Sequence, residues 1–236
     1  MYTRPSKNFF FPLLKKELAK TGDGIGVDVG SAGMKNRGMF LTDIYIGIDI
    51  NQELLQKGLE KENSANTFGL VADITKLNSL PSNFADVVAS SNTLYCLPEE
   101  KIPEAIKSLS RITRNGGSLL YQILKGKDTQ FEKTIQELAK QFQTVKVIYY
   151  KNFINNLYEK FFERDGNLGS HPLAGSKPFL FLSYLLSRLE YLTCKMPLLN
   201  KEVFIICRNK VENNKTAEHF DITKFNEVSN RLYRLI

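Results

Sequence analysis

Short apolar runs alternate with segments of helical period through the first 150 residues. Runs this short and this apolar are typical of strands buried on both faces of a parallel sheet. They predict strands at 25–29, 45–50, 68–73, 86–91 and 118–124. The segments between them predict helices at 33–41, 52–62, 98–112 and 131–142. Strands and helices therefore alternate along this stretch, which predicts a doubly wound, Rossmann-like α/β fold with a mostly parallel sheet.

The remaining pattern predicts additions to this alternation. Residues 8–20 form an amphipathic pattern, with the helix expected after Pro12. Further strands are expected at 145–150 and 202–207, and the intervening segment of about 50 residues is too long for a plain connection. It contains predicted helices at 153–162 and 179–194 around a Gly/Pro loop at 166–178. The tail predicts either a small helix at 225–235 or a mobile end.

We therefore expect a seven-stranded, mostly parallel sheet with an antiparallel strand near the C-terminus. One domain would cover 1–208, with an N-terminal helix at 1–22. A helical lid insert would occupy 151–200, between strands six and seven, and a tail would follow at 209–236.

Composition narrows the class of protein. The three cysteines, Cys96, Cys194 and Cys207, fit no zinc spacing, and their odd number argues against a disulfide framework. We expect no bound metal. The apolar run at 9–14 precedes two lysines, the wrong order for a signal peptide, and the run at 179–186 is too short to span a bilayer. These features predict a soluble, cytoplasmic protein. The formal net charge of +7 is spread along the chain, as on a solvated surface.

A tight turn, Gly30-Ser31-Ala32-Gly33, follows the first strand. A strand that ends in such a turn and opens a helix is how α/β sheets build nucleotide sites. Asp28, Asp49 and Asp73 lie at the ends of three successive strands, which share one edge of the sheet. Asp49 follows the turn by about 20 residues, the spacing of an acid that accepts both ribose hydroxyls. Asp73 could accept a hydrogen bond from the exocyclic amine of adenine, although each aspartate alone could equally cap a helix.

Six segments in order carry a family resemblance. They are VDVGSAG (27–33), IGIDI (46–50), ADIT (72–75), FADVVASSNTLYCL (84–97), RITRNGGSLL (111–120) and EVFIICRN (202–209). The set resembles the class I S-adenosylmethionine-dependent methyltransferases, especially the ubiquinone/menaquinone-type, methyltransferase-11-like group. The resemblance implies S-adenosyl-L-methionine as cofactor and methyl transfer as the reaction. The family's Gly-x-Gly-x-Gly turn is altered here, because Ala32 and Met34 replace its second and third glycines.

The resemblance also assigns roles by position. The methionine part of the cofactor would be held by the turn residues Gly30, Ser31, Ala32 and Gly33, and its ammonium group by Asp28. The ribose would be bound by Asp49, with Ile50 beside it, and the adenine by Asp73 and Ile74. Ser90 would approach the sulfonium. Asn92, Tyr95 and Cys96 would face the acceptor, with Tyr149 as a further acceptor-binding candidate.

A general base is needed only for an acceptor that must lose a proton. The candidates are His171, in the Gly-Ser-His-Pro loop of the insert, and Tyr95, while His219 lies in the polar tail and is discounted. The aromatic residues of the insert suggest an apolar or aromatic acceptor pocket. Alternatively they pack the insert onto the sheet, or residues 179–192 with Lys195 form a peripheral membrane-contact face.

Three functions are compatible with the sequence. The first is methyl transfer to the oxygen or nitrogen of a small molecule, such as a natural product, a sugar or a lipid-like compound. The second is an RNA methyltransferase, which the positive charge favours; the absence of an Asn-Pro-Pro-Tyr-like tetrapeptide at 91–94 disfavours nucleic acid. The third is a non-catalytic methyltransferase-like partner subunit. This function stays compatible because Ala32 and Met34 depart from the family's glycine turn. The pattern makes no prediction of oligomeric state.

Overall fold

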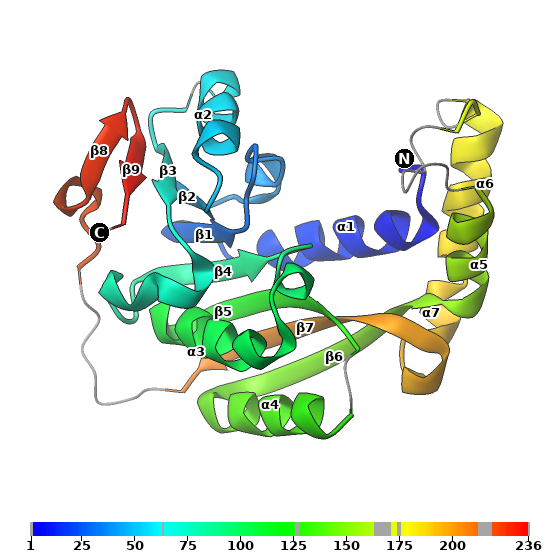
Figure 1. Ribbon diagram of the computed structural model, residues 1–236. Coiled ribbons are helices and arrows are strands. Elements are labelled where there is room, and N and C mark those ends of the chain that lie inside the picture. The colour runs from blue at the N-terminus through cyan, green and yellow to red at the C-terminus, as the bar shows by residue number, and fades with distance from the viewer. Residues whose placement is uncertain are drawn as a thin grey trace.

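The fold is one twisted sheet with helices on both faces (Figure 1). The computed structural model describes residues 2–62, 64–125, 128–162, 171–173, 176–211 and 219–235. The sheet has nine strands in the order β6-β7-β5-β4-β1-β2-β3-β9-β8. The strands are β1 (Ile25–Val29), β2 (Ile44–Asp49), β3 (Thr67–Val71), β4 (Ala85–Ser90), β5 (Thr113–Leu124), β6 (Phe142–Asn152), β7 (Asn200–Lys210), β8 (Asn226–Ser229) and β9 (Leu232–Arg234).

The strand pairing confirms the predicted class of fold. β1 pairs in parallel with β2 and β4, β2 with β3, and β4 with β5. β7 is antiparallel to both β5 and β6, as expected for a strand near the C-terminus. Strand order reverses across β1 and β4, so the carboxyl ends of these two strands form the switch point where α/β sheets bind ligands.

Helices cover the two faces of this sheet. α1 (Pro5–Leu18) and α2 (Gln52–Lys61) pack on one face. α3 (Ile102–Ile112) and α4 (Asp128–Gln141) pack on the other. Strand side chains alternate between the two cores, so that Val27 and Val88 lie in one and Val87 and Ala89 in the other. α1 begins at Pro5, seven residues before the expected start, and continues through Pro12.

The predicted helix at 33–41 is wrong. The chain there makes turns and a short 3₁₀ segment, Arg37–Met39. Ala32 and Met34 both have positive φ, 45° and 56°, which an α-helix cannot contain. Gly33 and Gly38 further weaken helix formation. The connection from β1 to β2 is therefore a compact loop.

The predicted helix at 225–235 is also wrong, because the described part of the tail contains strands in its place. It forms β8 and β9, and β9 adds in parallel to the edge of β3. The buried side chain of Leu232 packs next to Gly69 of β3, where a Cβ would leave it no room. The Arg231 guanidinium donates to the backbone carbonyls of Leu59 and Glu62 at the end of α2. The tail thus covers an exposed sheet edge and raises the strand count from seven to nine.

The insert leaves the sheet at the end of β6 and extends beyond it (Figure 1). It contains α5 (Phe153–Phe162), α6 (Lys177–Ser187), α7 (Glu190–Thr193) and a 3₁₀ turn, η6 (Pro197–Leu199). The predicted helix at 179–194 is thus divided into α6 and α7. α6 packs against the N-terminal half of α1, where Asn8 donates to the Ser183 hydroxyl (2.9 Å). In the described part of the chain, no helix combines the length and the apolar character needed to cross a membrane.

Candidate functional site

The turn after β1 is held against the loop after β4. Gly30 has φ of 77°, a left-handed conformation that favours glycine. A Cβ at Gly30 would lie 1.9 Å from the Thr93 hydroxyl oxygen, so that only glycine allows this close approach. The Gly30 and Ser31 amides donate to the Ile48 carbonyl at 2.7 and 3.1 Å. The loops after β1, β2 and β4 are therefore built as one unit.

Asp49 ties this turn to the end of β2. The Ala32 amide donates to Asp49 Oδ2 (2.8 Å) and the Asn51 amide donates to Oδ1 (2.9 Å). Each carboxylate oxygen keeps a second lone pair for a further donor. The side chain is partly exposed at the sheet edge, beside Ile50, which is 72% exposed. This placement leaves the Asp49 oxygens able to accept further hydrogen bonds.

Asp28 is fully buried at the same edge. Its carboxylate accepts from the Tyr45 hydroxyl (2.9 Å) and from the Asn36 amide (3.2 Å to Oδ2). Burial raises the pKa of Asp28 from 3.8 to about 6, although the hydrogen bonds from Tyr45 and Asn36 oppose the rise. An adjacent cation would offset the burial cost. The carboxylate is therefore suited to an ammonium group.

Asp73 makes the helix-cap contact that was the alternative explanation for it. Its Oδ1 accepts from the Thr75 amide (2.9 Å) and the Thr75 hydroxyl (2.8 Å), and these bonds lower its pKa. The same tripeptide, Asp-Ile-Thr, recurs in the tail, where Asp221 bonds Thr223 in the same way. The cap is thus intrinsic to the tripeptide and by itself says nothing about adenine. Ile74 is buried beneath Asp73.

Two buried hydroxyl groups at this edge are available to form hydrogen bonds with a bound molecule. Ser31 Oγ and Ser90 Oγ are buried and have no hydrogen-bond partner in the described part of the chain. A buried polar atom without a partner is costly, so a bound group that supplies one is favoured. Asp28 can pair with an ammonium group, and Asp49 is partly exposed. Together with these two hydroxyl groups, the two carboxylates fit an adenosyl amino acid.

Met34 does not block the turn. Its side chain is buried in the core beneath the loop, between glycines of β2, β3 and α2. A Cβ at Gly58 would lie 2.9 Å from Met34 Cγ, and one at Gly47 would lie 3.2 Å from Met34 Cε. The positive φ of Met34 turns the side chain inward. The departure from the family's glycine therefore serves packing, and Gly33 and Ala32 remain at the partly exposed surface of the turn.

A cavity of about 280 Å³ opens at the carboxyl ends of β4, β5 and β6. It is lined by Arg4, Ser6, Lys7, Phe10, Asn92, Tyr95, Leu124, Tyr150, Lys151 and Glu202. These residues come from the start of α1, the loop after β4 and the ends of three strands. The lining includes three cationic side chains and one carboxylate, so the cavity is polar and predominantly cationic.

A hydrogen-bonded network supports the floor of this cavity. The Asn92 amide donates to Gln122 Oε1 (2.9 Å), and Gln122 Nε2 donates to Glu202 Oε2 (2.8 Å). Lys151 pairs with Glu202 (2.8 Å) and with Glu159 (3.4 Å). Burial lowers the pKa of Lys151, but the carboxylates of Glu202 and Glu159 outweigh it and the net shift is upward. Lys151 therefore stays charged.

The structure brings some predicted acceptor residues together and separates others. Asn92 and Tyr95 line the cavity, and Cys96 is exposed beside them. Tyr149 lies on the opposite face of β6, against the α3–α4 core, and Tyr150 takes the cavity position that the sequence assigned to Tyr149.

The position of His171 does not support the predicted catalytic role. Its ring stacks on Phe179 (5.3 Å) and meets Phe162 edge-on (5.3 Å), within the insert. Among described residues the cavity lining contains no residue of α5, α6 or α7. His171 is thus a packing residue of the insert.

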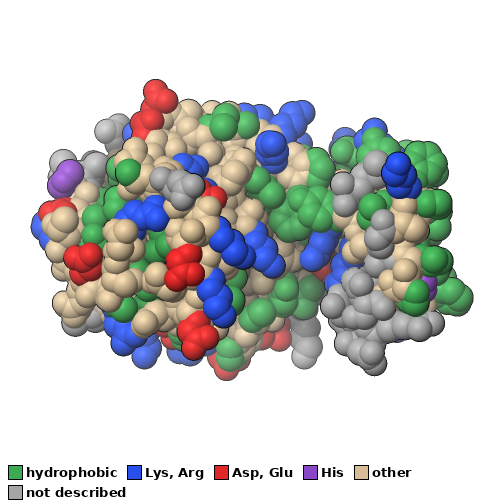
Figure 2. Space-filling view, turned by 90° about the horizontal axis from the view of Figure 1, so that it is seen from above, with side chains coloured by type: hydrophobic (Ala, Val, Ile, Leu, Met, Phe, Trp, Pro, Cys, Tyr) green, Lys and Arg blue, Asp and Glu red, His purple; other side chains and the backbone are tan. Residues whose placement is uncertain are grey.

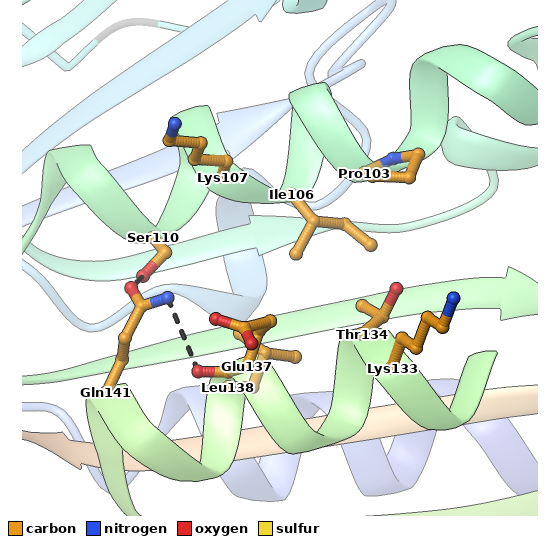
Figure 3. A pocket seen from close by; sticks show the side chains of 9 residues that line it. All are labelled: Pro103, Ile106, Lys107, Ser110, Lys133, Thr134, Glu137, Leu138 and Gln141. Carbon is orange, nitrogen blue, oxygen red and sulfur yellow. Dashed lines mark hydrogen bonds between the residues drawn. The ribbon is translucent and has the colours of Figure 1, made fainter. Parts of the chain in front are cut away.

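A larger cavity of about 640 Å³ lies between α3 and α4 (Figure 3). It is a groove on the outer face of the helical layer, where Ser110 donates to Gln141 Oε1 (2.5 Å). None of the predicted site residues lines it. The smaller cavity at the strand ends therefore remains the candidate acceptor site.

Comparisons with known proteins agree with this geometry. Residues 24–121 match a family model described as a methyltransferase domain. Over this segment, which is less than half of the chain, the sequence is similar to methyltransferase domains. The matched segment runs from the start of β1 into β5 and so contains the glycine turn and all three strand-end aspartates. A search of curated protein sequences found no match to the chain.

Solved structures share the fold of the methyltransferase domain at low identity. The [4+2]-cyclase SpnF is 14% identical, with a TM-score of 0.58, over 87% of this chain and 81% of that one. NodS, an N-methyltransferase from Bradyrhizobium japonicum solved with S-adenosylhomocysteine, is 14% identical, with a TM-score of 0.53, over 84% of each chain. Phosphoethanolamine N-methyltransferase 2 from Haemonchus contortus, solved with S-adenosylmethionine, is 17% identical, with a TM-score of 0.54. That match covers 87% of this chain but 52% of the other.

Proposed function

We propose that the protein transfers a methyl group from S-adenosylmethionine to a small-molecule acceptor, by oxygen or nitrogen methylation. The main support for this proposal is that the end of β4 contacts both the edge proposed for the cofactor and the cavity proposed for the acceptor. Asn36 donates to Ser91 Oγ (3.0 Å) as well as to Asp28, on the side proposed for the cofactor. The next residue, Asn92, bonds Gln122 on the cavity side.

The proposed cofactor would supply a sulfonium that is already a good methyl donor, so the chain's task is binding, orientation and exclusion of water. Asp28 holds an ammonium and Asp49 a ribose diol. Asp73 and Ile74 are proposed for the adenine, with Gly30, Ser31, Ala32 and Gly33 along the methionine part and Ser90 near the sulfonium. Ile50 covers the ribose side. Each of these residues lies at the strand-end edge, which supports the assignment.

The acceptor side favours a molecule that carries an anionic group. Burial lowers the pKa of Lys7, and the neighbouring charge of Arg4 lowers it further. A bound anion would relieve both effects because it pairs with these cations. The acceptor class that fits best is therefore a small phosphorylated or carboxylated molecule.

A proton acceptor within the cavity is Glu202, the carboxylate among the described lining residues. Partial burial raises the pKa of Tyr95, and the charges of Cys96 and Glu202 raise it further, so this phenol stays protonated. We therefore assign Tyr95 to hydrogen bonding with the acceptor, beside Asn92, and the proton to Glu202 when one must be removed.

Calorimetry with S-adenosylhomocysteine tests the proposal. Wild-type protein should bind, and Asp49→Ala should weaken binding about 100-fold, because two hydrogen bonds to a charged carboxylate are lost. Asp43→Ala is the matched control. Asp43 lies just before the start of β2, at the end opposite to Asp49, and accepts a hydrogen bond from the Gly24 amide (3.0 Å). This substitution should leave the affinity for S-adenosylhomocysteine within about twofold of wild type. No binding by wild type, or equal effects of the two substitutions, would contradict the proposal.

A further inference from the structure

The insert carries helices whose buried and exposed residues are reversed relative to an ordinary surface helix. In α5 the buried positions include Asn155 and Glu159, whereas Phe153, Leu157 and Phe161 form an exposed stripe at four-residue spacing. Phe161 is 80% exposed and Phe153 is 69% exposed. A water-facing helix normally shows the opposite arrangement.

α6 and the turns after it repeat this reversal. α6 buries Ser183 and Ser187, together with Phe179 in its first turn, and exposes Phe181, Leu182 and Leu185. Beyond it, Leu192 is 72% exposed and Leu198 is 91% exposed. Most of the exposed large apolar side chains in the described residues belong to this insert. Figure 2 shows them gathered over the insert, at the right of the view, with Lys and Arg among them.

The two buried carboxylates of the insert are hydrogen-bonded, so the reversal is part of the fold. Glu190 is fully buried and accepts from the Asn155 amide (2.5 Å) and the Lys151 backbone amide (3.0 Å). Glu159 accepts from the Ser6 hydroxyl (2.5 Å) and pairs with Lys151. The insert is thus anchored to α1 and β6 through polar contacts, which leaves its apolar surface facing outward.

Among the described residues, the exposed charges on this surface have one sign. The exposed charged residues described in the insert and at its junction with β7 are Lys160, Lys177, Arg188, Lys195 and Lys201. The described carboxylates of the same region are turned inward, as Glu159 and Glu190 show. Lys160 lies beside Phe161, and Lys195 lies between Leu192 and Leu198 along the chain, so basic and apolar side chains are interleaved.

We propose that this face of the insert docks on a membrane surface that contains anionic phospholipids. Exposed aromatic and aliphatic side chains would enter the boundary between headgroups and acyl chains, while the lysines and Arg188 pair with the headgroups. An apolar hollow of about 320 Å³, lined by Phe153, Leu192 and Leu199 among others, lies within the face and could take part of an acyl chain.

A second copy of the chain fits this face less well. A two-fold contact would bring the same patch of each copy together. Lys160, Lys177 and Lys195 of the two copies would then share one interface, with no exposed carboxylate described on the insert to pair with them. Burial of unpaired like charges is costly. An anionic bilayer supplies the opposite charge.

Vesicle flotation tests this proposal without reference to methyl transfer. The full-length protein should float with vesicles of phosphatidylcholine and phosphatidylglycerol, and less with phosphatidylcholine alone. Binding should fall as salt rises, because the headgroup charges are screened. Phe161→Gln with Leu198→Gln should weaken binding at least about tenfold, since both apolar side chains would leave the bilayer.

Two controls keep the result interpretable. Leu41→Gln removes a leucine that is 62% exposed outside the insert and should leave vesicle binding unchanged. All three substitutions are of exposed side chains, so the melting temperature should stay within a few degrees of wild type in each variant.

Lys160→Gln with Lys195→Gln should reduce binding to the anionic vesicles and leave binding to phosphatidylcholine alone unchanged. The proposal is overturned if wild type does not float with anionic vesicles, or if the Phe161/Leu198 variant binds like wild type. A wild-type dimer in light scattering that this variant dissociates, without flotation, would assign the face to a second copy instead. Selective capture of an acidic protein, again without flotation, would also overturn the proposal.

Discussion

The two halves of the strand-end edge are built from contacts of very different range. On the half proposed for the cofactor, Ala32 bonds Asp49 across 17 residues of sequence, Tyr45 bonds Asp28 across 17, and Asn36 bonds Asp28 across 8. On the acceptor half, Gln122 bonds Glu202 across 80 residues, and Ser6 bonds Glu159 across 153. Apart from the contacts of Asn36 and Gly30 with the loop after β4, the first half is therefore encoded in one local stretch, and the second depends on the assembled fold.

This difference suggests that the two halves can be disrupted separately. Changes near the glycine turn should act on cofactor affinity, whereas changes in the network under the cavity should act on stability and on the acceptor. The four predictions below test this separation, from the largest expected effect to the smallest.

Gly30→Ala should be the most damaging. The new Cβ would overlap the Thr93 side chain, which costs about 1–3 kcal/mol, and the left-handed backbone adds about 1–2 kcal/mol. Urea denaturation should show a free energy of unfolding lower by about 4 kcal/mol, with cofactor affinity lost.

Gly116→Ala separates these two causes. Gly116 has φ of 75°, but a Cβ there would meet nothing within 4 Å. It should cost about 1–2 kcal/mol, from the backbone alone. An equal loss at both glycines would show that the contact between Gly30 and Thr93 is unimportant.

The second prediction concerns pH and Asp28. Its folded pKa, about 6, is above its ordinary 3.8, so the stability from the protonated form is fully present below 3.8 and is lost as pH rises through 6. That loss is roughly 3 kcal/mol. An ammonium prefers the ionised carboxylate, so affinity for S-adenosylhomocysteine should instead fall up to about tenfold per pH unit below 6.

Stability and affinity should therefore change in opposite directions between pH 4 and 6.5. Calorimetry and denaturation over this range measure both, with Asp28→Asn as the comparison. The variant should lose both dependences. If affinity stays constant between pH 5 and 7 in wild type, Asp28 does not hold the ammonium.

The third prediction concerns the acceptor half. Lys151→Met removes the cation between Glu202 and Glu159 and should lower the free energy of unfolding by about 2 kcal/mol, a value reduced because the lysine is partly exposed. Affinity for S-adenosylhomocysteine should stay within about twofold. Lys140→Met, which breaks an exposed pair with Glu137, should change stability by less than about 0.5 kcal/mol. A large loss of cofactor affinity in Lys151→Met would end the separation of the two halves.

The smallest effect is expected at Asp73. Asp73→Ala should cost about 1 kcal/mol of stability through loss of the cap, and should weaken S-adenosylhomocysteine binding several-fold if the side chain also reads adenine. Asp221→Ala removes the same cap in the tail and should not change affinity. Equal affinities in the two variants would leave Asp73 as a cap alone.

The range of contacts also explains what could be predicted from sequence. The strand runs and the aspartates at 28, 49 and 73 lie within short windows, so their order predicted the sheet and the edge that we propose for the cofactor. Asn36 and Tyr45 lie in the same stretch but were missed, because neither belongs to the glycine and aspartate pattern. Gln122 was detectable in principle, as a polar residue within an otherwise apolar strand.

The remaining misses have separate causes. Lys151, Glu202 and Glu159 are ordinary charged residues until the fold brings them together, and no local pattern marks them. The loop at 33–41 departs from helix because Met34 adopts a left-handed backbone to bury its side chain. The tail reads as amphipathic at helical spacing, yet Leu232 gains more by joining the open edge of β3.

Hydrogen exchange with and without S-adenosylhomocysteine tests most directly the claim that the cofactor occupies the half of the edge built from local contacts. Exchange should slow in segments 28–34 and 49–54, where the Ala32 and Asn51 amides are held by Asp49, and should stay unchanged in 151–160. Unchanged exchange at 28–34 under saturating ligand, or slowing confined to 151–160, would contradict it.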